Sequence, residues 1–310
     1  MNKGQPLAYL LLAILATVIL YAGSGLLGPA GMLGILLVPL PAAYLHLRYG
    51  RISGGVVIGV STVALTIMLS AAAAFQYLLL FGIGSWLLPY MISRGLRWDL
   101  AWAGTLLAEV LGAIPLLTFW ALKQGESLTG QVRSYIDQEI SKALAFYQQA
   151  DVSAQQVEEL RKGGQFLLEV VPRLYPGLIV ASLGISLLVL LALLVRVTRN
   201  RIEIPGPSFQ QWKTPEPLVW VVIAAGFTAF SPWPQLQTVA LNMLVVLLPL
   251  YFMQGMAVVS CFLARKGAPG FVKGLVYVLL VFINPLPMVV IGVGLFDLWA
   301  DFRKPKINSA

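Results

Sequence analysis

Long runs of apolar residues recur along this chain and restrict the folds that are open to it. Of its 310 residues, 58% are hydrophobic and 11% are charged, whereas an ordinary soluble domain has about 45–50% apolar and about 25% charged residues. An apolar run of about 18 residues is long enough to cross a bilayer as a helix. Backbone polar groups cannot stay unpaired in hydrocarbon, so these runs form helices rather than an open sheet. The sequence therefore predicts an all-α, polytopic transmembrane helical bundle.

The apolar segments predict about eight to ten membrane spans. They lie at about residues 7–21, 30–47, 54–71, 75–92, 100–122, 174–195, 218–230, 239–263 and 271–299. In the second segment, Pro39 and Pro41 remove backbone donors and should kink the helix, which neighbouring helices in a bundle tolerate. The last segment contains Asn284-Pro285-Leu286-Pro287 at its centre, so it forms either one broken helix or a hairpin of two short helices.

The distribution of basic residues indicates how the chain is oriented. Cytoplasmic loops of membrane proteins are enriched in Lys and Arg. A cytoplasmic N-terminus puts the following basic residues inside: Lys3, Arg48, Arg51, Arg94, Arg97, Arg196, Arg199, Arg201, Lys213, Arg265, Lys266 and Lys273. A hairpin at 271–299 also brings Arg303, Lys304 and Lys306 to that side, so we expect this arrangement and a cytoplasmic C-terminus. The same rule accounts for the net charge of +8 without nucleic acid. We expect a membrane protein whose main partner is the lipid bilayer.

A hydrophilic segment at 123–172 separates the fifth apolar segment from the sixth, and it holds seven of the thirteen acidic residues. Five apolar residues in it are spaced four, four, three and four positions apart, which places them on one face of a helix: Val132, Ile136, Ile140, Ala143 and Tyr147. The chain thus divides into a five-span N-terminal half (1–122), this insertion (123–172) and a C-terminal half (173–310).

A second, short helix is predicted at 154–162 within the insertion. Ser153 and Gln156 resemble a capping box at its start, and Gly163-Gly164 should end it. We expect the two helices to form an amphipathic hairpin outside the membrane, close to the bilayer.

Glu109 is the clearest candidate for a functional residue. It lies ten residues beyond Asp99, about 15 Å along a helix and therefore near the middle of the bilayer. Ionisable groups inside a membrane are costly and mark functional sites. One interpretation is a contact to a proton, a cation or a substrate. The other is a protonated or hydrogen-bonded carboxyl that fixes helix packing, because Gly104, Ala108 and Gly112 form a small-residue stripe beside it.

Other polar residues lie within the apolar segments of the C-terminal half. Asn242, Tyr251 and Gln254 share one predicted span, and Asn284 lies at the break in the last one. The two amides of the shared span are twelve residues apart, about 18 Å of helix, so they cannot grip one small ligand unless other helices contribute. Each of these residues is a candidate substrate contact or a hydrogen-bonding link between helices.

Motifs of the common enzyme classes are missing from the sequence. It has no Walker lysine loop, HExxH, dinucleotide glycine fingerprint or GxSxG elbow. One cysteine, Cys261, gives neither a disulfide framework nor a thiolate metal site. Asp297 and Asp301 lie next to Arg303 and Lys304, which indicates a solvated salt-bridge cluster. We expect a non-enzymatic protein without a metal or cofactor.

Four segments together resemble a known family. They are Pro39-Leu-Pro41 running to Tyr49-Gly50-Arg51, Phe209-Gln-Gln-Trp212-Lys213-Thr-Pro215, Asn242 leading to Tyr251-Phe-Met-Gln254-Gly255, and Gly294-Leu-Phe-Asp297-Leu-Trp299-Ala-Asp301-Phe-Arg303. In this order the chain resembles the YybS-like family of uncharacterised bacterial inner-membrane proteins over nearly its whole length. That family has no established activity, so the resemblance adds no catalytic residues.

The first six predicted spans are also similar in pattern to the substrate-binding components of energy-coupling-factor transporters. Those bundles capture a vitamin or metal and dock on a separate transmembrane and ATPase module. The insertion and the additional C-terminal spans depart from that pattern.

Two hypotheses about function follow from these features. A small-solute-binding or transport component should have Glu109 and the amides converging on a polar cavity. A membrane scaffold for cell-envelope machinery should have a filled bundle and an exposed apolar face on the insertion.

Overall fold

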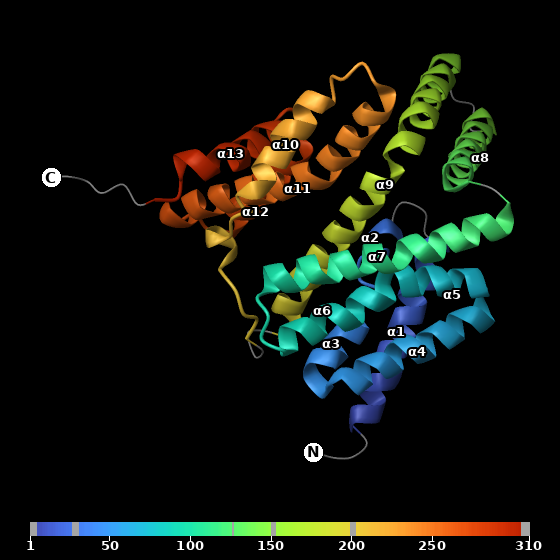
Figure 1. The fold of residues 1–310 in the computed structure, drawn as a ribbon. Helices are drawn as coiled ribbons and strands as arrows, with labels where there is room; N and C mark the ends of the chain where they lie inside the picture. The colour runs from blue at the N-terminus through green and yellow to red at the C-terminus, as the bar shows by residue number, and fades with distance from the viewer. Residues whose placement is uncertain (1–4, 27–30, 126, 150–152, 199–202, 305–310) are drawn as a thin grey trace. The chain divides into compact units, whose positions relative to one another are not determined.

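The computed structural model describes residues 5–26, 31–125, 127–149, 153–198 and 203–304. Within these ranges every regular element is a helix and no strand is present (Figure 1), which confirms the all-α prediction. Contacts divide the chain into two units, one formed by Met1–Phe119 with Ser182–Gly206 and the other by Trp120–Ala181 with Pro207–Ala310. The predicted features at Lys3, Ala30, Arg199, Arg201 and Lys306 lie outside the described residues.

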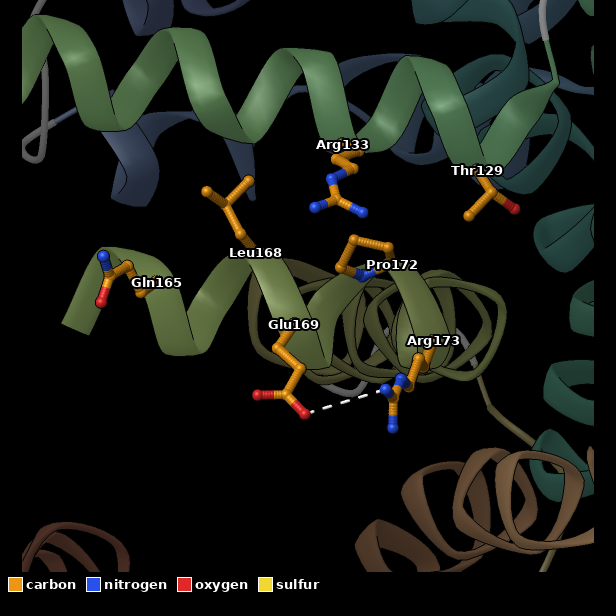
Figure 2. Close-up of a pocket in the computed structure, with 7 residues that line it drawn as sticks. All are labelled: Thr129, Arg133, Gln165, Leu168, Glu169, Pro172 and Arg173. Carbon is orange, nitrogen blue, oxygen red and sulfur yellow. Dashed lines mark ion pairs between the residues drawn. The ribbon is translucent and has the colours of Figure 1, made fainter. Parts of the chain in front are cut away.

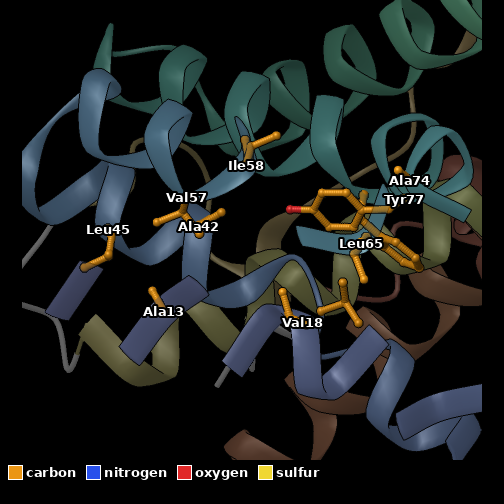
Figure 3. Packing of buried hydrophobic residues seen from close by; sticks show 11 residues of the cluster. Ala13, Val18, Ala42, Leu45, Val57, Ile58, Leu65, Ala74 and Tyr77 are labelled. Atoms are coloured by element: carbon orange, nitrogen blue, oxygen red, sulfur yellow. The ribbon is translucent and has the colours of Figure 1, made fainter. Parts of the chain in front are cut away.

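The first unit contains the N-terminal helices and the last part of α9. Its elements are α1 (Gln5–Leu26), α2 (Gly31–Ile35), α3 (Leu40–Tyr49), α4 (Arg51–Met68), α5 (Ala71–Tyr77), the π-helix η2 (Leu78–Gly82), α6 (Ile83–Ser93), most of α7 (Trp98–Gln124) and the end of α9 (Ala154–Thr198). Side chains of α1, α3, α4 and α5 form its apolar core, in which Val57, Leu65 and Tyr77 are fully buried or nearly so (Figure 3).

The two prolines of the second predicted span break the helix rather than kink it. Residues 36–39 form turns between α2 and α3. Pro39 is the residue before α3, and Pro41 lies in its first turn, where the missing N–H has no helical partner to lose. The resulting α3 has 10 residues, about half of what a membrane crossing requires.

The second unit contains the insertion and the C-terminal helices. Its elements are α8 (Leu128–Gln149), the first part of α9, the 3₁₀ helix η3 (Phe209–Gln211), α10 (Pro217–Thr228), α11 (Pro234–Arg265), α12 (Gly270–Phe282) and α13 (Leu286–Ala300). Glycines let α11 and α13 approach closely, because a Cβ on Gly255 would overlap the carbonyl oxygen of Val290, and one on Gly294 would overlap that of Tyr251.

The insertion is helical as predicted, but its second helix is much longer than expected. The apolar face of α8 is partly buried at Val132, Ile136 and Ile140. The Ser153 hydroxyl accepts the Gln156 N–H at 3.4 Å and donates to Gln156 Oε1 at 3.0 Å, so Ser153 and Gln156 cap the start of the helix as predicted. However, α9 continues through Gly163-Gly164 to Thr198, and the prediction that these glycines end it is wrong.

Packing explains why the helix continues. Gly164 is buried, and a Cβ there would lie 2.8 Å from Cγ2 of Ile140. Its missing side chain admits the Ile140 side chain of α8, and this packing offsets the roughly 1 kcal/mol that each helical glycine costs relative to alanine.

Six helices in the described ranges are long and apolar enough to cross a membrane, or up to seven if the pair α12 and α13 counts as one span. These two helices are bent by 102° at their break. The sequence predicts eight to ten spans because it counts four further segments as spans. These segments fold as α2–α3, α10, α12 and α13. Each of these helices is shorter than 18 residues.

Candidate functional site

The Glu109 carboxyl is buried in the first unit. Glu109 lies on α7 with 1% of its surface exposed. Gly84 of α6 makes room for it, since a Cβ there would lie 2.5 Å from Oε1 of Glu109 and 2.7 Å from Cδ2 of Leu187 on α9. The carboxyl therefore sits among three helices at a position where α6 has no side chain.

Neither oxygen of Glu109 has a side-chain hydrogen-bond partner among the described residues. The ion pairs found within the described ranges also leave it out. A buried carboxylate without a counter-charge costs several kcal/mol. Such a group avoids this cost by holding a proton or by binding a cation. The Glu109 carboxyl can do either.

Nearby polar side chains are already engaged. The Ser85 hydroxyl donates to Gly82 O at 3.0 Å, and that of Thr105 donates to Ala101 O at 2.7 Å. Trp102 of α7 donates its indole N–H to Gly184 O of α9 at 2.9 Å, which links the two helices beside the site. The small-residue stripe is only partly used for packing, because Gly104 contacts Met91 whereas nothing lies within 4 Å of a Cβ placed on Gly112.

Asn242 connects α11 to α9 in the second unit. Its Oδ1 accepts the Gly177 N–H at 2.7 Å, and its Nδ2 donates to Arg173 O at 2.8 Å. These two backbone atoms are the donor and acceptor that an α-helix joins directly. They flank Pro176, whose ring disfavours regular helical bonding. The side-chain amide therefore ties α11 to the proline-containing turn of α9.

Gln254 belongs to a buried polar network. The side chain is fully buried, its Oε1 accepts the Thr214 N–H at 2.9 Å, and its Nε2 donates to Oδ2 of Asp297 at 3.2 Å. Asp297 on α13 is also fully buried and pairs with Arg303 at 2.5 Å. The interpretation of Asp297 as part of a solvated cluster is therefore wrong.

Arg303 closes this network against the loop that precedes α10. Its NH1 donates to the carbonyl oxygens of Gln210 at 2.9 Å and Trp212 at 2.7 Å. Arg265, at the end of α11, donates to the backbone oxygens of Arg303 and Lys304. We call this set the C-terminal clamp: Gln210, Trp212, Thr214, Gln254, Arg265, Asp297 and Arg303.

Asp301 lies at the exposed edge of the clamp and matches the solvated salt-bridge prediction. It pairs with Lys213 at 2.9 Å and with Lys304 at 3.1 Å. Hydrogen bonds from Lys213 and then Lys304 lower the pKa of its carboxyl.

The two remaining candidates have different surroundings. Tyr251 is fully buried one turn before Gln254, and its hydroxyl has no hydrogen-bond partner in the described part of the chain. Asn284 is exposed at the break between α12 and α13. Among the residues that the structure describes, no group of three or more His, Cys, Asp or Glu side chains could hold a metal ion.

A comparison with protein families accounts for nearly the whole chain. The model of a family described as "Predicted membrane protein (DUF2232)" matches residues 14–298. The chain belongs to this family. Neither the curated proteins nor the solved structures gave a match. The apolar helices and the family together make it a multi-pass membrane protein.

In this DUF2232 protein, Gln254 belongs to the C-terminal clamp and Tyr251 lies one turn before it on α11, whereas Asn242 and Asn284 lie elsewhere in the same unit. Glu109 belongs to the other unit. Sequence reasoning from single residues misses the buried Asp297–Arg303 pair. The sequence does contain a sign of this pair: three of the four segments that carry the family resemblance contribute residues to the clamp.

Proposed function

We propose that this DUF2232 protein is a non-enzymatic component that binds or transports a small solute, and that Glu109 binds a proton, a cation or the solute itself. The observation that supports this proposal is the burial of a carboxyl at 1% exposure, with no side-chain partner for either oxygen among the described residues. Ionisable side chains inside membranes are costly, and they commonly mark pathways for ions, protons or substrates.

The composition of the first unit supports the likeness to substrate-binding components of energy-coupling-factor transporters. This unit groups nearly all of the first five apolar segments with residues 182–195 of the sixth, at the end of α9, and excludes α8. It therefore corresponds to the six-segment pattern noted in the sequence. The likeness is an analogy at the level of the fold. It makes a separate transmembrane and ATPase module the expected partner.

The amides of α11 do not take part in this proposal. All polar atoms of the Asn242 and Gln254 side chains contact other groups of the chain. They stabilise the second unit, and this leaves Glu109 as the residue to test.

Thermal unfolding of the purified protein in detergent tests the proposal. The wild type is compared with Glu109→Gln against vitamins, nucleobases and divalent metal ions, each over a pH series. Glu159→Gln is the control, because it removes an exposed carboxyl from α9. A ligand at 100 times its Kd stabilises the folded state by about 2.7 kcal/mol.

We expect at least one ligand to stabilise the wild type and the Glu159→Gln variant but not Glu109→Gln. If no ligand stabilises the wild type and Glu109→Gln is as stable as the wild type at every pH, the site has no binding role. The carboxyl would then be a packing group.

Exposed aromatic residues favour a second candidate function, a membrane scaffold. Tyr135 and Phe146 of α8 are 66% and 68% exposed, and Phe166 of α9 is 63% exposed. Large exposed apolar side chains mark protein or membrane contacts when they gather in one region. Photo-crosslinkers at Tyr135 and Phe146 in intact cells test this role. A discrete protein adduct from position 135 that Phe146→Ser abolishes supports the scaffold, whereas adducts with lipid alone contradict it.

A further inference from the structure

A pocket of about 450 Å³ lies between α8 and the first part of α9 (Figure 2). Its polar lining comes from Thr129 and Arg133 of α8 and from Gln165, Glu169 and Arg173 of α9. Leu168 and Pro172 add an apolar surface. The pocket belongs entirely to the second unit and is separate from Glu109.

The charges of the lining favour an anion. The lining carries two guanidinium groups and one carboxylate, and Arg133 forms no ion pair with a described residue. Glu169 and Arg173 extend together from the side of α9 that is turned away from α8 (Figure 2). Glu169 lies 3.7 Å from Arg173, with both side chains well exposed. This separation is longer than a charge-assisted hydrogen bond, so the pair is weak. Figure 2 shows the Arg133 side chain reaching from α8 toward Pro172 of α9.

The position of Arg173 along α9 indicates the depth of the pocket. The 22 residues 174–195 that follow it carry no charge. At 1.5 Å per residue they are about 33 Å long, which matches the hydrocarbon core of a bilayer. Arg173 therefore lies where the apolar part of the helix ends, at the level of the lipid headgroups.

We propose that this pocket binds a phosphate group, with Arg133 as its charged donor between the two helices, Arg173 as a second charged donor at the rim, and Thr129 and Gln165 as neutral donors. Guanidinium groups bind phosphate through paired hydrogen bonds. Basic pockets beside transmembrane helices bind anionic lipid headgroups. Leu168 and Pro172 offer apolar contact to the carbon atoms next to a phosphodiester. The phosphate belongs either to an anionic lipid or to a small soluble phosphate ester.

Binding to the intact, delipidated protein in detergent tests this site. Three probes are titrated separately: dioleoyl phosphatidylglycerol, dioleoyl phosphatidylcholine and glycerol phosphate. Native mass spectrometry counts bound lipid, and calorimetry follows glycerol phosphate. Arg133→Gln and Arg173→Gln remove one donor each. Arg161→Gln is the matched control, because Arg161 is an exposed arginine of α9 that does not line the pocket.

We expect phosphatidylglycerol to bind more tightly than phosphatidylcholine, and each pocket variant to weaken this binding about tenfold or more. Arg161→Gln should leave it unchanged. Equal binding of glycerol phosphate would show that the soluble ester is sufficient, and its absence would assign the site to lipid. If neither anionic probe binds, or if Arg161→Gln weakens binding as much as Arg133→Gln, the proposal is overturned.

Discussion

Gly84 provides the space that the Glu109 carboxyl occupies, so alanine at this position should be destabilising. Its methyl group would contact both Oε1 of Glu109 and Cδ2 of Leu187 at less than van der Waals distance. Overpacking of this kind costs about 1–3 kcal/mol. We expect Gly84→Ala to lower the free energy of unfolding by this amount in denaturant titrations in detergent.

Gly112→Ala is the control for this change, because a Cβ at Gly112 meets nothing within 4 Å. It should be neutral or slightly stabilising, since alanine favours helix more than glycine does. Equal effects of the two substitutions would mean that the carboxyl moves freely away from α6.

Asp297 and Asp301 are four residues apart on the sequence but should respond very differently to removal of their charge. Asp297→Asn leaves the guanidinium of Arg303, which is 7% exposed, without a counter-charge. Breaking a buried ion pair costs about 3–5 kcal/mol. The partners of Asp301 are more exposed, and such surface pairs contribute about 0–1 kcal/mol.

Denaturant titrations of the two variants, side by side, measure this difference. Asparagine also tolerates the positive φ of 42° at position 301, so Asp301→Asn tests the charge without adding backbone strain. A loss of less than 1 kcal/mol for both variants would contradict the assignment of Asp297 and Arg303 as a buried pair.

Local sequence correctly describes Asp301 and misjudges Asp297, for a physical reason. The neighbouring Arg303 and Lys304 predict a solvated cluster for both carboxylates. The burial of Asp297 depends on Gln254 of α11 and on the way that Arg303 reaches the backbone of Gln210 and Trp212. These groups are about 40 to 90 positions away along the chain, so no local pattern encodes the contact. In contrast, the position of Glu109 within a long apolar helix can be read from the sequence, and α7 contains it.

At the scale of elements, the close contact of α11 with α13 depends on two glycines. A Cβ on Gly255 would overlap the carbonyl oxygen of Val290, and the backbone of the partner helix cannot yield as a flexible side chain can. We expect Gly255→Ala to separate the two helices and to destabilise the second unit by about 1–3 kcal/mol. Intrinsic tryptophan fluorescence during unfolding measures the effect.

Gly292→Ala provides the matched control on α13, because no atom lies within 4 Å of a Cβ at that position. It should unfold like the wild type. If Gly255→Ala unfolds like the control, then α11 and α13 are not held in backbone contact.

Helix boundaries are predicted well where a local hydrogen bond sets them and poorly where packing does. The Ser153–Gln156 capping box marks the start of α9 correctly, because the groups that satisfy the helix end are three residues apart. Gly163-Gly164 wrongly predicts the end of the helix, because the packing of the Ile140 side chain of α8 against Gly164 is not visible in the local sequence. The amide of Asn242 likewise stabilises α9 near Pro176 from a different helix.

At the scale of the whole molecule, charge asymmetry predicts which segments lie on the cytoplasmic side, and the clamp adds a constraint to that prediction. Arg265, at the end of α11, donates to the backbone of Arg303 and Lys304, which follow α13. Lys213, which precedes α10, pairs with Asp301. These contacts hold three chain segments at one end of the second unit. The chain leaves this end through α12 and returns to it through α13, so the two helices form a hairpin. They are bent by 102° at their break, which agrees with a hairpin.

Cysteine labelling of intact cells decides between this hairpin and a single broken span. In a Cys261→Ser background, single cysteines replace Lys142 of α8, Lys266 after α11 and Lys304 after α13. We expect a membrane-impermeant maleimide to label position 142 in intact cells with a permeabilised outer envelope. Positions 266 and 304 should react only after the membrane that holds the protein is opened, because loops rich in Lys and Arg are expected on the cytoplasmic side. If position 304 reacts from outside while position 266 does not, α12 and α13 cross the bilayer as one span. Arg265 and residues 303–304 would then lie on opposite surfaces of the membrane, about 30 Å apart. The hydrogen bonds between them in the clamp could not form.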